Sequence, residues 1–96
     1  MRYKVIILEE AKSDFRETFN WYKNINPKLS KRFYISFKES LNLLKNNPLN
    51  FQLRYDENRI IVLKTFPHLI HFSIEGNTII IKAIYHSSRD SKLNLF

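Results

Sequence analysis

Three consecutive residues near the end of the chain, Tyr85, His86 and Ser87, carry side chains that could take part in acid–base chemistry. They follow a long apolar run, and Arg89 comes shortly after them. An imidazole changes charge near neutral pH, so His86 at the end of a strand could serve as a general acid or base. The same histidine could instead cap the sheet through a hydrogen bond to the following turn. The residues alone leave both interpretations open.

Basic residues in the second half of the chain form a second candidate group. Side chains of this kind, placed together, could grip phosphates or stabilise the extra charge of a pentacoordinate phosphorus. We expect several of them to gather on one face or rim of a sheet and to bind a target or a nucleic acid there, together with Tyr85. The alternative is an ordinary solvated sheet surface. The group is Arg54, Arg59, Lys64, Lys82 and Arg89.

The remaining patterns point away from metal and cofactor chemistry. His68 and His71 have a spacing that suits a metal site on a helix, but they lie in a strand-like run, where an odd separation places side chains on opposite faces. We therefore expect one half-buried and one exposed histidine, no metal and no cofactor. The chain has no cysteine and a single glycine, which excludes thiol catalysis and a glycine-rich phosphate loop. The carboxylates of this half do not pair as in glycosidases or two-metal nucleases.

The composition is that of one basic domain. With 96 residues, 44% of them hydrophobic and 15% aromatic, the chain can build one core, so we expect a single domain over residues 1–96. The formal net charge of +7 favours an anionic partner over a merely solvated surface. No apolar run approaches the ~20 residues that span a bilayer, and the start MRYKVIILEE turns acidic too early for a signal peptide. We expect a cytoplasmic protein without a membrane partner.

The first half of the chain predicts one strand and two helices. Apolar residues alternate over 2–8, which is typical of a strand. From there the apolar spacing changes to three or four residues, which predicts an amphipathic helix over about 10–23. Asn26 can cap a second helix and Pro27 suits its first position, and Pro48 ends it, so this helix should run from Pro27 to about Asn46. The two helices should form a hairpin.

The second half predicts an antiparallel meander over residues 60–63, 68–74 and 78–85. The Phe66-Pro67 pair marks the first turn, and Gly76-Asn77 marks a tight hairpin, because both residues tolerate positive φ. Residues 47–58 should form a loop with a short strand at 52–55, and residues 91–96 are either a helical turn or disordered. The order is β-α-α-β-β-β, an α+β fold of two layers. We expect the first strand to pair inside the sheet.

With these elements in place, the chain resembles the toxins of the RelE/ParE superfamily, which belong to bacterial type II toxin–antitoxin pairs. The similarity runs nearly from end to end, and its specificity lies in the order and spacing of the motifs rather than in any one of them. The residues that carry it are Ala11, Asp14, Trp21-Tyr22, Arg32-Phe33, Leu44, Asn47-Pro48, Arg59, Val62-Leu63, Phe66-Pro67 and His86-Ser87-Ser88-Arg89-Asp90.

The resemblance implies a small basic toxin that a cognate antitoxin neutralises with an acidic, helical tail. Members similar to RelE cut messenger RNA on the ribosome without a metal, and members similar to ParE bind and inhibit DNA gyrase. For the ribonuclease alternative, the resemblance implies His86 as the acid–base group, with Arg59, Lys64 and Arg89 as phosphate grips. For the gyrase inhibitor, it implies a binding surface on the last strand and tail.

The chain departs from the ribonuclease pattern at two positions. Such enzymes often carry an arginine where the third strand opens, and this chain has the run His68-Leu69-Ile70-His71 instead. A histidine lacks the bidentate fork of a guanidinium and is charged only when protonated. Many of these enzymes also place a tyrosine after the histidine, whereas His86 is followed by Ser87. Together with the Phe66-Pro67 turn, these departures favour the branch similar to ParE.

Overall fold

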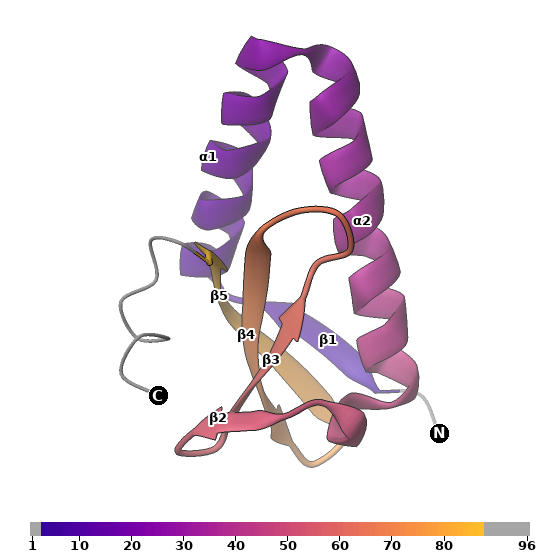
Figure 1. Ribbon diagram of the computed structural model, residues 1–96. Coiled ribbons are helices and arrows are strands. Elements are labelled where there is room, and N and C mark those ends of the chain that lie inside the picture. The colour runs from indigo at the N-terminus through magenta and orange to yellow at the C-terminus, as the bar shows by residue number, and fades with distance from the viewer. Residues whose placement is uncertain (1–2, 88–96) are drawn as a thin grey trace.

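The computed structural model describes residues 3–87 as two layers, a five-stranded sheet and a helical hairpin that packs on one of its faces (Figure 1). The predicted α+β class and the predicted order of elements are confirmed, and the short strand predicted at 52–55 is present as β2. The elements are β1 (Lys4–Ile7), α1 (Glu9–Ile25), α2 (Pro27–Asn46), the 3-10 turn η1 (Pro48–Asn50), β2 (Leu53–Tyr55), β3 (Asn58–Val62), β4 (His68–Glu75) and β5 (Thr78–His86).

The first strand lies at an edge of the sheet, so the expectation that it pairs inside the sheet was wrong. The strand order is β1-β5-β4-β3-β2, and β1 runs parallel to β5, with Val5 opposite Ile79 and Ile7 opposite Ile81. The reason is the compact meander. Tight turns hold β3, β4 and β5 against one another, and β2 takes the outer edge of β3. The strand β1 therefore pairs with the outer edge of β5, which the meander leaves free.

The boundaries of α2 agree with the prediction because its signals are local. The Asn26 side chain accepts a hydrogen bond from the Lys28 backbone N–H at 3.0 Å, and Pro27 occupies the first helical position. The helix α1 is longer than predicted and begins after Leu8 without a side-chain cap. Two glutamates in its first turn face the positive end of the helix dipole instead.

Aromatic side chains of the two helices fill the space above the sheet. Phe33 is fully buried, and its ring centroid lies 5.3 Å from Phe15, 5.6 Å from Tyr22 and 5.5 Å from Phe66. The sheet meets these rings with buried side chains of its own, including Phe72. The apolar side of α2 therefore faces the core, and the core fixes where both helices lie over the strands.

Two turns of the meander differ in how well their residues suit them. Gly76 has a φ of +60° in the β4–β5 hairpin, as the sequence predicts, because a glycine adopts this conformation without steric cost. The turn between β3 and β4 has Thr65 at a φ of +69°. A β-branched residue rarely adopts this conformation. Thr65 is therefore a strained position, and the surrounding structure must enforce its conformation.

Candidate functional site

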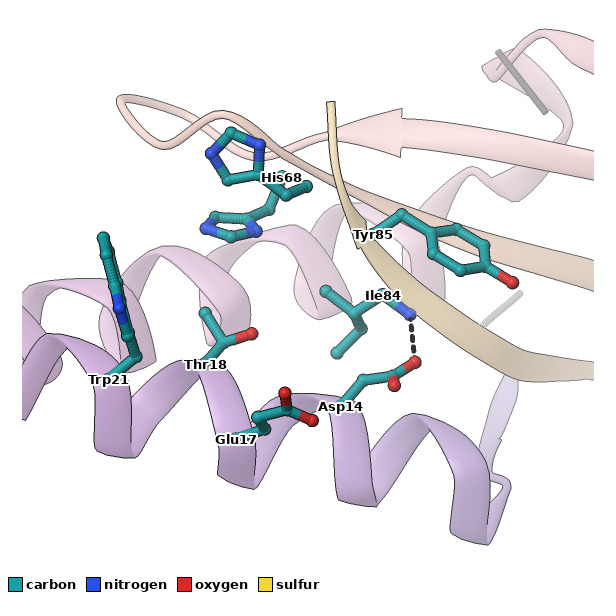
Figure 2. A pocket seen from close by; sticks show the side chains of 8 residues that line it. Asp14, Glu17, Thr18, Trp21, His68, Ile84 and Tyr85 are labelled. Atoms are coloured by element: carbon teal, nitrogen blue, oxygen red, sulfur yellow. Dashed lines mark hydrogen bonds between the residues drawn. The ribbon is translucent and has the colours of Figure 1, made fainter. Parts of the chain in front are cut away.

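A cleft opens between one face of α1 and the C-terminal end of β5 (Figure 2). Its volume is about 250 Å³. The helix contributes a wall of residues spaced three or four apart, the strand contributes its last three residues, and the start of β4 contributes a histidine. The lining residues are Asp14, Glu17, Thr18, Trp21, His68, Ile84, Tyr85 and His86.

Asp14 ties the helix to the strand. Its Oδ2 accepts a hydrogen bond from the backbone N–H of Ile84 at 3.0 Å, beyond the point where β1 stops pairing with β5 (Figure 2). Burial raises the pKa of Asp14 above its ordinary value of 3.8, the Ile84 hydrogen bond acts to lower it, and the negative charges of Glu10 and Glu17 raise it further. The bond satisfies an edge N–H that the sheet leaves without a strand partner.

The His86 imidazole lies in the cleft beside a second, buried imidazole. The ring centroids of His68 and His86 are 5.0 Å apart and the planes are perpendicular. His68 is buried, and its Nε2 lies 3.0 Å from the Tyr22 hydroxyl of α1, within hydrogen-bonding distance. His86 is only half-buried and therefore remains accessible from the cleft. The accessible ring lines the same cleft as the Asp14 and Glu17 carboxylates and could act as an acid or base toward a group that enters.

Tyr85 and His71 belong to the other face of the sheet. Their rings lie 4.7 Å apart and perpendicular, and the Tyr55 hydroxyl is 2.9 Å from His71 Nδ1. In Figure 2 the Tyr85 ring points away from His68. His68 and His71 thus lie on opposite faces, as predicted. The expectation that one of them is exposed was wrong, because both faces of β4 are covered and both side chains are buried.

The structure separates the basic residues that the sequence grouped. The Arg59 guanidinium donates from Nη1 to the Phe51 carbonyl at 2.7 Å, which ties β3 to the connection before β2. Lys64 is exposed in the turn beside α2, and Lys82 is the extra residue of a β-bulge in β5. Arg59, Lys64 and Lys82 thus lie in three different surroundings, in β3, in the β3–β4 turn and in the β5 bulge. Arg89 and the tail predicted over 91–96 lie outside the described residues, as does the Arg54 side chain.

Sequence reasoning did not assign the α1 wall of the cleft to a site. Glu17 and Thr18 lie among the polar residues that the helical period predicts on the solvent side, and Trp21 is 56% exposed. The spacing of Asp14, Glu17, Thr18 and Trp21 places them on one helical face, and this spacing is the signal that could have marked them. Among residues 3–87, no three His, Asp or Glu side chains group as metal ligands, and no helix is long and apolar enough to cross a membrane.

The comparisons with known proteins decide the family. Residues 5–91 match the family described as the ParE toxin of the type II toxin–antitoxin system parDE. The chain belongs to the ParE toxin family. A search of curated proteins gave no significant match.

The fold agrees with this assignment to the ParE toxin family. The solved structure described as the chromosomal ParDE TA system from P. aeruginosa is similar at a TM-score of 0.77 and 18% sequence identity, covering 88% of this chain and 96% of that one. At this identity the likeness concerns the fold. The resemblance to the RelE/ParE superfamily is confirmed in its ParE branch, and the protein is a toxin of a type II toxin–antitoxin system.

Proposed function

We propose that this toxin arrests growth by binding and inhibiting DNA gyrase, and that a cognate antitoxin neutralises it. Family membership supports the toxin role, and the electrostatics of the cleft support binding over RNA cleavage. We also propose that it acts in the cytoplasm, where gyrase and its DNA are found.

The observation that carries the choice between the two targets is the charge around His86. Asp14 and Glu17 line the same cleft, and none of the lining residues among 3–87 is a lysine or an arginine. A phosphate that approached His86 would meet two carboxylates of its own sign. A ribonuclease needs the opposite arrangement, because the charge that develops on phosphorus in the transition state requires cations or hydrogen-bond donors aimed at it.

The alternative is a ribosome-dependent mRNA endoribonuclease, and one observation favours it. His86 is accessible in a cleft and could serve as an acid–base group there. Arg59, one of the three expected phosphate grips beside Lys64 and Arg89, already donates to the Phe51 carbonyl. We therefore place the ribonuclease second.

A matched pair of assays separates the two targets. Induced expression in a susceptible bacterium should arrest growth, and co-expression of the adjacent antitoxin gene should restore it. The purified protein should inhibit supercoiling by gyrase, while primer extension on cellular mRNA shows no new ends. Codon-positioned cuts that vanish in His86→Ala would establish the ribonuclease instead, and harmless overproduction of the folded protein would refute both targets.

A further inference from the structure

We propose that the turn Lys64-Thr65, together with Arg32 and Ile35 of α2, is a preformed docking site for an acidic, partly apolar segment of the antitoxin. This inference rests on the proposed function, because it names where the antitoxin binds. The site lies beside α2 and does not share a lining residue with the cleft next to α1.

The first observation is the strain in the turn. Thr65 has a φ of +69°, and its Cβ carries two substituents that crowd the backbone in this conformation. Such a conformation costs free energy, so it persists only where the surrounding structure enforces it. An asparagine or glycine would adopt it at less cost. Strained positions of this kind are common where a protein holds a segment in its binding conformation.

The second observation is what enforces the turn. Leu63 and Phe66, on either side of it, are buried in the core. Between them, the Ser36 hydroxyl of α2 donates a hydrogen bond to the Lys64 carbonyl at 2.8 Å. Lys64 and Thr65 themselves are exposed. The turn is therefore fixed at three points while its two central side chains face solvent. Binding of a partner would then cost little conformational entropy in the turn, because the turn is already ordered.

The third observation is the surface around the turn. A hollow of about 260 Å³ brings together Arg32 from the helix and Lys64 from the turn, and its lining is Arg32, Ile35, Ser36, Glu39, Lys64 and Thr65. Ile35 is 55% exposed. Ile35 also lines a neighbouring apolar hollow with Phe19, Lys31 and Tyr34. The exposed Ile35 side chain thus lies between the two hollows, and each hollow also has at least one cation in its lining.

These three features fit an acidic protein segment better than a nucleic acid. Carboxylates of the partner can pair with Arg32 and Lys64, and its aliphatic side chains can cover Ile35, which a phosphate backbone would leave exposed. The exposed Glu39, which also lines the hollow, would repel a phosphate chain, whereas a partner segment can place an uncharged residue opposite it. The net charge of +7 attracts an acidic partner to the toxin as a whole.

The charge contacts can be tested with the full-length toxin, separated from a co-expressed complex, and the full-length antitoxin encoded beside it. Calorimetry should show that Lys64→Ala and Arg32→Ala each weaken binding by roughly tenfold, as expected for a charge-assisted hydrogen bond at an interface. Lys23→Ala on α1 removes the same charge away from the hollow and should change the dissociation constant less than about twofold. Unchanged binding of both hollow variants to an antitoxin that still neutralises the toxin would refute the site but not the proposed function.

A variant that relieves the strain at Thr65 can separate a docking role of the turn from a purely structural one. Thr65→Gly should raise the midpoint of thermal unfolding, because glycine adopts the left-handed conformation without strain. It should weaken antitoxin binding by several fold, because glycine leaves the exposed centre of the turn less ordered before binding. The matched control is Asp56→Gly, which changes the other non-glycine residue with positive φ, in the β2–β3 turn. It should leave antitoxin binding unchanged.

Three further outcomes would overturn the proposal. A lower unfolding midpoint for Thr65→Gly would mean that the turn is not strained. A stabilised Thr65→Gly variant with normal antitoxin binding would mean that the strain serves no docking. A defect of Lys64→Ala in binding duplex DNA, with antitoxin affinity unchanged, would assign the hollow to nucleic acid. No binding of the unaltered toxin to its antitoxin would instead refute the proposed function.

Discussion

The cleft beside α1 and the turn beside α2 solve the same structural problem with opposite chemistry. In the cleft, the Asp14 carboxylate of the helix accepts a hydrogen bond from the Ile84 backbone N–H. At the turn, the Ser36 hydroxyl of the helix donates one to the Lys64 carbonyl. The carboxylate brings a charge with it and the hydroxyl brings none. An unpaired backbone N–H needs an acceptor, which here is a charged carboxylate, whereas an unpaired carbonyl needs a donor, which here is a neutral hydroxyl.

Phe33 lies between the two regions and should give the largest effect. Its ring contacts His68 of the cleft at 5.3 Å and Phe66 of the turn at 5.5 Å between centroids, and it is fully buried. Phe33→Ala should cost about 3–5 kcal/mol in the free energy of unfolding, because it leaves a cavity in the core. Urea denaturation of the variant measures this loss. A loss below about 1 kcal/mol would contradict the burial of the second helix on the sheet.

The next largest effect comes from two variants of Asp14 that separate the contribution of its hydrogen bond from that of its charge. Asp14→Ala leaves the Ile84 N–H without its partner and should lower the free energy of unfolding by about 1–3 kcal/mol. Asp14→Asn keeps an acceptor oxygen and should cost clearly less than the alanine variant. Equal losses in the two variants would show that the charge rather than the bond matters. Chemical denaturation at neutral pH gives both values.

The Ser36 hydroxyl at the turn should contribute less to the free energy of unfolding than the Asp14 carboxylate in the cleft. Ser36→Ala removes a neutral donor from the Lys64 carbonyl and should cost about 0.5–1.5 kcal/mol in the free energy of unfolding. The carbonyl keeps access to water because Lys64 is exposed. Urea denaturation of Ser36→Ala, run beside Asp14→Ala, measures the difference. A larger loss at Ser36 than at Asp14 would reverse the comparison.

The smallest effect is a pH dependence that only the cleft should show. Burial raises the pKa of Asp14 in the folded protein above 3.8, so between the two values the folded state binds more protons than the unfolded state. The free energy of unfolding should therefore fall as pH rises through this window, and the carboxylate's contribution is most favourable below it. Asp14→Asn should lack this fall. Unfolding curves of both proteins, taken from below pH 3.8 to neutrality, test the sign.

The sequence predicted those elements whose signals are local. The start of α2 is marked by Asn26 and Pro27, and Gly76 marks the hairpin, so each could be read from a few neighbouring residues. The edge position of β1 depends on which strand edge is left free, which no local pattern records. The burial of His71 likewise depends on Tyr55 and Tyr85, which lie beside it on the sheet face away from the helices.

The candidate site was less predictable than the fold for the same reason. His86 was found because its residue type and its place after a strand are both visible in the sequence. The Asp14 bond joins residues that are 70 positions apart, so its partner appears only in three dimensions. Thr65 could not have been predicted at a positive φ, because its residue type argues against that conformation. The structure overrides local preference at the turn where we infer a docking role.

The pairing of β1 with β5 joins the first strand of the chain to the last. During synthesis, β1 and both helices leave the ribosome before the strand that completes their sheet, and this contact closes nearly the whole length of the chain. The sheet of the nascent toxin is therefore incomplete until β5 has left the ribosome. A cell that translates the antitoxin first would therefore have the inhibitor present when the toxin completes its fold.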